Sequence, residues 1–355
     1  MTIVAHAHPF VIGVDTHARN HVLAVVTPTG QKIDSAQFPT TQAGMARAIA
    51  WAGARTGGDL EALWVIEGIG SYGAQLATTV ETRGYPVAEA PQMDARAHRA
   101  RGKSDVLDAH RIAAAALPLA TDQLRHPRLS EGVRAALRVL ITARDLMTTQ
   151  RTATLNALTA LLRLVDLGID ARRPLTNAQV MIVARWRPRA EDLATATART
   201  EAIRLAKQAH DLTDQITTNA AGINDLVRAS HGAPLLDKPG IGPITAAIAL
   251  TAWSHHGRVH SEAAFAALAG TNPIPASSGN TTRHRLNRGG DRRLNRALHT
   301  TALNRMIHDP QTRAYVEKRR AQGLTTKEIR RCIKRYLARQ IYRTLNATPN
   351  PLDET

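Results

Sequence analysis

The first 120 or so residues alternate short apolar runs with stretches of helical periodicity, and this alternation limits the folds open to the chain. Short apolar runs bounded by turn residues predict strands, whereas apolar residues at three- and four-residue steps predict helices. The order strand, strand, strand, helix, strand, helix, strand, helix is predicted over residues 10–14, 21–27, 32–38, 42–52, 62–66, 72–82, 85–88 and 105–117. This order predicts a mixed β-sheet covered by helices, that is, an α/β domain.

From about residue 130 the chain becomes helical in pattern. Apolar residues recur at three- and four-residue steps, which predicts a long amphipathic helix or a helical pair. Gly168 and Pro174 interrupt the pattern, which resumes over 191–227. We interpret this region as a coiled-coil linker, with a spacer or dimerisation role. A mainly helical region begins near Ala233 and contains a polar loop over 272–290. The predicted divisions are 1–125, 126–230, 231–345 and a tail over 346–355.

Positive charge is concentrated in one segment. The chain has 46 Lys and Arg against 29 Asp and Glu, a formal net charge of +17. Residues 283–343 hold 18 of the basic residues and only four acids. Such a segment favours binding to a polyanion. Nucleic acid is favoured over a membrane because no stretch of the chain approaches the ~20 apolar residues of a membrane span. Aromatic residues make up only 3% of the chain, which favours contact with the nucleic-acid backbone over base stacking.

The N-terminal residues and the cysteine count suggest the compartment. The first residues lack the basic segment, long apolar core and cleavage site of a secretory signal. The single cysteine, Cys332, excludes an internal disulfide and a cysteine-rich zinc site, and we interpret it as an ordinary helix residue. We expect a cytoplasmic protein that associates with the nucleoid when it is bound to DNA.

Four carboxylates form a candidate metal site in the first region. Asp15 and Glu67 each end an apolar run predicted as a strand, and a buried carboxylate there is costly without a cation or a donor. Asp105 and Asp108 lie one helical turn apart on one face. Converging oxygen ligands suit Mg²⁺ or Mn²⁺, which can support phosphodiester chemistry. Each acid alone is more often a cap, a turn residue or a surface residue.

Two histidines lie close to Asp15 in the sequence. His17 and His21 are weaker candidates for this site, and we interpret both as exposed strand or turn residues.

The third region contains a glycine turn. Residues 238–242, Lys-Pro-Gly-Ile-Gly, resemble a helix-hairpin-helix turn whose backbone N–H groups could face a phosphate. A simple turn between two packed helices is an equally good interpretation.

A serine pair and a group of basic residues follow that turn. Ser277 and Ser278 lie in a loop rich in glycine and proline, beside arginines that could hold a scissile phosphate. By themselves they are more often turn formers than nucleophiles. The candidate nucleic-acid contacts of the region are Lys238, Gly240, Gly242, Arg283, Arg285, Arg288, Arg292, Arg293 and Arg296.

Taken together, these motifs resemble a known family. The chain carries Val-Ile-Gly-Val-Asp-Thr ending at residue 16, Ile-Glu-Gly-Ile-Gly-Ser-Tyr over 66–72 and Lys-Ser-Asp-Val-Leu-Asp-Ala over 103–109. It also carries Pro-Gly-Ile-Gly over 239–242 and Leu-Ala-Gly-Thr-Asn-Pro from 268, followed by Ser-Gly at 278–279. In this order they resemble the IS110-family transposases, relatives of the Piv invertases.

The resemblance implies a domain organisation and a set of site residues. It implies a RuvC-like (RNase H-type) DEDD domain, a coiled-coil linker and a C-terminal transposase domain with a serine nucleophile. Asp15, Glu67, Asp105 and Asp108 then become the catalytic and metal-binding acids, and Ser278 the nucleophile, with Ser277 the less favoured neighbour.

The resemblance also implies partners. A non-coding bridge RNA would pair with donor and target DNA. The chain would form a homo-oligomer, from dimer to tetramer, in which the acids of one subunit meet the serine of another.

From the resemblance we expect a DNA transposase that cuts and rejoins DNA through a Mg²⁺-dependent phosphoserine intermediate. Three alternatives stay open. They are a Piv-like site-specific invertase, a RuvC-like junction nuclease that uses water as the nucleophile, and a non-catalytic nucleic-acid-binding scaffold. Replacement of the serine distinguishes recombinase from nuclease, and replacement of an acid tests the scaffold.

Overall fold

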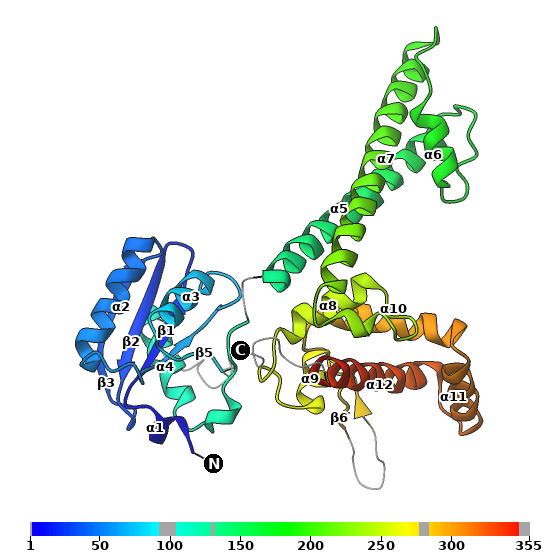
Figure 1. The fold of residues 1–355 in the computed structure, drawn as a ribbon. Helices are drawn as coiled ribbons and strands as arrows, with labels where there is room; N and C mark the ends of the chain where they lie inside the picture. The colour runs from blue at the N-terminus through cyan, green and yellow to red at the C-terminus, as the bar shows by residue number, and fades with distance from the viewer. Residues whose placement is uncertain (1, 92–103, 129–131, 277–283, 348–355) are drawn as a thin grey trace. The chain divides into compact units, whose positions relative to one another are not determined.

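The computed structural model describes residues 2–91, 104–128, 132–276 and 284–347, and the chain divides into two compact units (Figure 1). The first unit comprises Met1–Ser130 with Ser254–Val259, and the second comprises Glu131–Trp253 with His260–Thr355. The second unit therefore contains both the long helices after residue 131 and the C-terminal helices.

The first unit is built on a mixed five-stranded sheet. The strand order is β3-β2-β1-β4-β5, with β2 antiparallel to both β1 and β3, and β4 parallel to both β1 and β5. This arrangement confirms the predicted RuvC-like (RNase H-type) fold class. The elements are α1 (Val4–Ala7), β1 (Val11–Thr16), β2 (Asn20–Val26), β3 (Lys32–Pro39), α2 (Gln42–Thr56), β4 (Leu63–Ile66), α3 (Ala74–Thr82), β5 (Val87–Glu89), α4 (Asp105–Ala116) and the 3₁₀ helix η1 (Thr121–Gln123).

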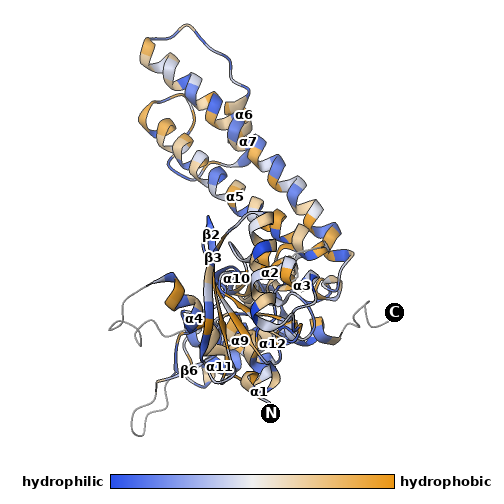
Figure 2. Cartoon of the chain, turned by 90° about the vertical axis from the view of Figure 1, so that its left-hand side faces the viewer, coloured by the Kyte–Doolittle hydropathy of each residue, from blue (hydrophilic) through white to orange (hydrophobic). Residues whose placement is uncertain are grey.

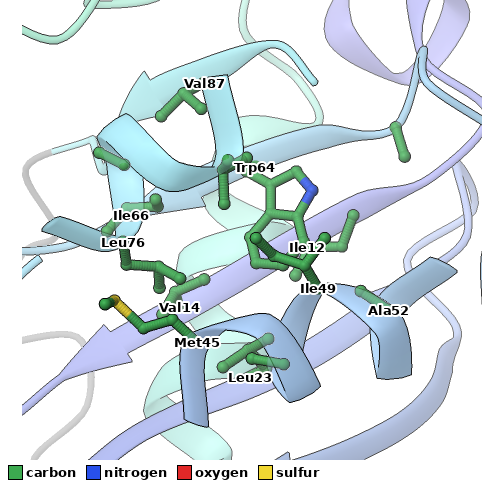
Figure 3. Packing of buried hydrophobic residues seen from close by; sticks show 14 of the residues in the cluster. Ile12, Val14, Leu23, Met45, Ile49, Ala52, Trp64, Ile66, Leu76 and Val87 are labelled. Atoms are coloured by element: carbon green, nitrogen blue, oxygen red, sulfur yellow. The ribbon is translucent and has the colours of Figure 1, made fainter. Parts of the chain in front are cut away.

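Helices cover both faces of this sheet, and its central strands are mostly apolar and buried. On one face, Ile12, Val14, Trp64 and Ile66 belong to a buried cluster with side chains of α2 and α3 (Figure 3). On the other face, the alternate residues of the same strands form a second cluster with side chains of α4: Val11, Leu63, Val65, Ile112 and Ala113. Because successive strand residues point to opposite faces, the odd-numbered residues of β1 and β4 face α4.

Gly13 allows α4 to approach β1 closely. A Cβ at this position would lie 2.1 Å from the carbonyl oxygen of Ala109 and 2.7 Å from the backbone nitrogen of Ala113. No side chain fits between the strand and the helix backbone. The absence of a side chain at residue 13 therefore sets the position of the whole helix.

We expect Gly13→Ala to displace α4 and destabilise the protein by about 1–3 kcal/mol or more, because the added methyl group overlaps helix backbone. Urea denaturation of the full chain measures this loss. Gly53→Ala within α2 is the matched control, since its Cβ would meet only the Tyr85 hydroxyl, at 3.5 Å. The control should be neutral or stabilising, as alanine favours a helix over glycine. An unchanged stability of Gly13→Ala would show that α4 can move without cost.

The second unit is almost entirely helical. Its elements are α5 (Gly132–Leu164), α6 (Asn177–Ala184), α7 (Leu193–Arg228), the 3₁₀ helix η2 (Ala233–Leu235), α8 (Pro243–Trp253), α9 (Glu262–Leu268), β6 (Ile274–Pro275), β7 (His284–Arg285), α10 (Arg292–His308), α11 (Pro310–Ala321) and α12 (Thr326–Ala347). Three features differ from the sequence predictions. The helix α6 lies in the predicted interruption, the hairpin β6–β7 lies in the predicted loop, and α12 includes the first two residues of the predicted tail.

The long helices α5 and α7 form an antiparallel pair. The Leu140 carbonyl accepts a hydrogen bond from Asn219 Nδ2 at 3.0 Å, and Arg151 Nε donates to Thr213 Oγ1 at 2.7 Å, so numbers rise along one helix as they fall along the other. Polar and apolar residues alternate along both helices (Figure 2), as expected for an amphipathic pair. The helix α6 adds Val180 and Val183 to their apolar cluster.

Within the part of the chain that the structure describes, no helix combines the length and the apolar character needed to cross a membrane.

Candidate active site

Adjacent parallel strands bring Asp15 and Glu67 together. Val14 in β1 is paired with Ile66 in β4, and the Glu67 backbone N–H donates to the Val14 carbonyl oxygen at 2.9 Å. Both acids continue the odd-numbered positions of their strands and so belong to the α4 face of the sheet. Asp15 is buried, with 8% of its surface exposed, whereas Glu67 is exposed.

The N-terminal turn of α4 supplies the other two acids. Ser104 caps the helix by accepting a hydrogen bond from the Leu107 N–H at 3.3 Å, and Asp105 and Asp108 follow in the first turn. The unpaired N–H groups of a helix N-terminus favour negative charge there. Asp108 Oδ1 also accepts a hydrogen bond from Arg111 Nη1 at 2.9 Å.

The imidazole of His17 joins the acids of the strand and the helix. Its Nε2 atom lies 3.2 Å from Asp15 Oδ2 and 3.6 Å from Asp105 Oδ2. One ligand atom from each of these three residues lies within 4.8 Å of the other two. His17 is exposed and lies between β1 and β2, as predicted, but its contacts with two of the acids were not predicted. Its spacing of two residues from Asp15 was the only available signal, because Asp105 lies far away in the sequence.

Burial and mutual repulsion act on the strand carboxyls. The pKa of Asp15 is raised by burial, and His17 opposes this rise while Asp105 and Asp108 add to it. Although Glu67 is exposed as a residue, desolvation of its carboxyl by the surrounding protein raises its pKa, with further contributions from Asp15 and Asp108. All four predicted acids thus interact electrostatically at one edge of one unit. Such a group of oxygen donors, with an imidazole beside it, fits a divalent cation.

His21 lies in the sheet rather than at the surface. It is 2% exposed within β2, and its neighbours across the strands are Thr16 and Phe38. Its Nδ1 atom has no hydrogen-bond partner within the described residues, and burial lowers the pKa of the imidazole, with the charge of His17 as a further cause. The interpretation of His21 as an exposed residue was wrong, because the apolar run that contains it is a central strand.

The candidate serines Ser277 and Ser278, with Arg283, lie outside the described residues. Among the described residues before and after them, Ile274 pairs with Arg285 and Pro275 with His284 in a short antiparallel ladder.

The glycine turn over residues 238–242 lies between η2 and α8. Gly240 has φ +70°, a conformation that favours glycine, and both Gly240 and Gly242 are exposed. Arg305 Nε on α10 donates to the Pro239 carbonyl oxygen at 2.6 Å. The element before the turn is the three-residue η2, so a full helix does not precede it as in a helix-hairpin-helix.

The candidate arginines differ in their exposure to solvent and in their salt bridges. Arg285, Arg288, Arg292 and Arg296 are exposed. Arg293 is half-buried and forms a salt bridge with Asp145 of α5, its Nη2 atom lying 2.8 Å from Oδ2. Arg293 therefore helps to dock α10 on α5, and a phosphate would have to compete with Asp145 for it.

Comparison with known proteins gives two family matches in chain order. Residues 12–166 match the DEDD transposase model of the IS110 family, and residues 233–317 match the model of the IS116/IS110/IS902 transposase family. Together the two matches cover more than half of the chain.

Two related proteins align over almost the full chain. The 43.6 kDa protein of insertion element IS110 from Streptomyces coelicolor is 26% identical, and the alignment covers 88% of each chain. The 42 kDa protein of insertion element IS900 from Mycobacterium paratuberculosis is 27% identical, with 89% of this chain and 90% of the relative covered. The first family match includes Asp15, Glu67, Asp105 and Asp108.

Proposed function

Because the chain belongs to the IS110 family of insertion-sequence transposases, we propose that it cuts and rejoins DNA through a transient phosphoserine, with sequence choice supplied by a bridge RNA. The observation that carries this proposal is the convergence of Asp15, Asp105 and His17 beside Glu67 and Asp108. We assign the RuvC-like catalytic domain to 1–125, the coiled-coil linker to 126–230 and the transposase domain to 231–345.

We assign the divalent-metal site to the four acids. Asp15, Glu67, Asp105 and Asp108 would hold Mg²⁺ or Mn²⁺, and His17 is placed to add a nitrogen ligand or to neutralise the acids. Bound ions of this kind stabilise the charge on the attacking and leaving oxygens of a phosphodiester. The raised pKa values of Asp15 and Glu67 support the assignment, because a cation relieves the cost of keeping two neighbouring, partly desolvated carboxylates charged.

In the cutting step the Ser278 hydroxyl oxygen bonds to the scissile phosphorus, and one DNA oxygen leaves. The proton lost by the serine balances the one gained by the leaving oxygen. In the rejoining step a hydroxyl of a second DNA strand attacks the phosphoserine and releases the serine with its proton. The broken bond's energy stays in the protein–DNA link, so no outside energy source is needed.

The basic C-terminal segment supplies backbone contacts in this scheme. The exposed Arg285, Arg288, Arg292 and Arg296 suit phosphate binding, with Lys238 and the glycine turn over 239–242 as a second contact. A homo-oligomer, from dimer to tetramer, would let the acids of one subunit act with the serine of another.

The RNA requirement is tested with the full chain and DNA carrying the ends of its element. We expect strand cleavage at those ends to fall by at least about a thousandfold when the structured RNA encoded beside the gene is omitted, a ratio typical of specific over non-specific DNA sites. A scrambled RNA of equal length is the control. Equal cleavage with either RNA would contradict RNA guidance and favour an invertase or a junction nuclease.

A further inference from the structure

A cavity of about 800 Å³ lies in the second unit, between α12 and the β6–β7 hairpin. Residues 270–273 and 284–287 form one wall, and α12 together with Leu324, two residues before it, forms the other. The cavity and the β6–β7 hairpin belong to the same unit. None of the acids at the sheet edge contributes to it.

The wall from α12 is a helical stripe. Glu328, Arg331, Arg335 and Arg339 recur at three- and four-residue steps, so they lie along one face of the helix. From Glu328 to Arg339 this stripe is about 16 Å long at the rise of an α-helix. The cavity is thus elongated along α12, which suits a chain-like ligand better than a single small ion.

The cations of the cavity are only partly neutralised. Glu262 pairs with Arg339, and Lys334 Nζ donates to Asn295 Oδ1 at 2.6 Å. Glu328 accepts a hydrogen bond from the Thr325 N–H, at the start of α12. Within the described residues, the side chains of Arg285 and Arg331 make no hydrogen bond or salt bridge. The pKa of Glu328 is lowered by hydrogen bonds from Thr325 and, as a lesser cause, by the charge of Arg331.

This excess of positive charge favours an anion. Burial lowers the pKa of Lys334, with the charge of Arg330 as a further cause. Burial also lowers the pKa of Arg335, and neighbouring Arg339 lowers it further. A bound anion would relieve this repulsion.

An aromatic ring and apolar side chains line the same cavity. Tyr336 is 54% exposed, and its ring meets that of Tyr315 edge-on, with the centroids 5.8 Å apart. Tyr336 therefore brings a largely exposed aromatic ring to the lining of the cavity. Leu286, which is 49% exposed, and Leu324 add apolar surface. Cations combined with an exposed aromatic ring are the features that bind unpaired nucleotides, whose phosphates and bases need both.

We propose that this cavity binds a short unpaired segment of nucleic acid, with its phosphates on Arg285 and Arg331 and a base against Tyr336. This binding site rests on the proposed function, because that function is the reason to expect a nucleic acid as the ligand. A duplex keeps its bases stacked on one another and offers none to Tyr336. The low aromatic content of the whole chain, which argued against stacking, does not exclude one tyrosine acting at this position.

The test is fluorescence anisotropy of the full chain with three labelled probes: a twenty-nucleotide adenine strand of DNA, the same strand of RNA, and a DNA duplex of equal length. We expect Tyr336→Ala to weaken binding of at least one single strand by about tenfold, and Tyr336→Phe to restore it. Arg331→Ala should weaken binding of the same strand and reduce its salt slope by about one. The strand with the larger loss identifies the occupant.

Arg204→Ala on the exposed surface of α7 is the matched control and should leave binding of every probe unchanged. Circular dichroism verifies that each variant is folded. The proposal is overturned if Tyr336→Ala binds both single strands as the wild type does, or if its binding of single strand and duplex falls equally. The assay needs no strand cleavage, so failure of the serine chemistry and failure of this cavity give separate results.

Discussion

Replacing Asp105 by asparagine is expected to reduce metal-dependent DNA cleavage on the order of 10⁴-fold, the scale at which removal of one member of a catalytic group acts. Asp105 lies in the first turn of α4, and 55% of its side chain is exposed, so asparagine fits without strain. The change removes one negative charge beside Asp15 and His17. Its effect should therefore fall on cation binding and chemistry rather than on folding.

Single-turnover cleavage and calorimetric titration of Mn²⁺ measure the two consequences. The Asp105→Asn variant should bind the cation more weakly than the wild type and cut DNA at the background rate. Asp122→Asn is the matched control, because Asp122 is an exposed aspartate in the 3₁₀ helix η1 of the same unit. Full cleavage by Asp105→Asn would contradict a catalytic role for the acids and favour a structural one.

Replacing Ser278 by alanine is expected to abolish both strand cleavage and the covalent protein–DNA link, because the hydroxyl is the proposed nucleophile. The expected loss is again on the order of 10⁴-fold. Cation binding should stay unchanged, since the four acids belong to the other unit. Gel electrophoresis of labelled DNA under denaturing conditions measures cleavage and the covalent link together.

Ser277→Ala is the matched control for this experiment and should keep most of the activity. Continued cleavage by Ser278→Ala would contradict the recombinase mechanism and favour a junction nuclease that uses water. Loss of activity only in Ser277→Ala would move the nucleophile to the neighbouring residue. The pair of variants thus resolves a choice that two adjacent serines leave open.

Much of the first unit is predictable because its signals are local. Strand and helix periodicity predicts the five strands and α2 to α4 in their order, which the structure confirms, but it misses the short α1 and η1. The proximity of Asp15 and Glu67 follows only once β1 and β4 are known to be neighbours, which is a property of the topology. The contact from His17 to Asp105 is even harder to predict from the sequence, because it depends on the close approach of α4 to the sheet at Gly13.

The features that sequence analysis missed have weak local signals. The helix α6 contains four successive apolar residues, Val180–Val183, which show no helical period, and its burial comes from α5 and α7. The strands β6 and β7 have two residues each, and one of these is a proline. Their pairing depends on the tertiary structure. From sequence alone, a polar, glycine-rich segment is predicted as a loop.

The cavity on α12 illustrates the same limit. The spacing of Arg331, Arg335 and Arg339 is visible in the sequence and predicts one basic helix face. The opposite wall is formed by residues 270–273 and 284–287, which only the folded chain brings to α12. The low aromatic content of the chain therefore does not indicate that Tyr336 lines this cavity.

We propose that the acids of the RuvC-like unit support a covalent link between Ser278 and DNA. Tandem mass spectrometry of the peptide that stays attached to DNA, after reaction of the full chain and nuclease digestion, tests this link most directly. We expect a nucleotide phosphate on Ser278 that forms with Mg²⁺ and is absent after chelation or in Asp105→Asn. Cleaved DNA with free ends and no attached peptide would contradict it.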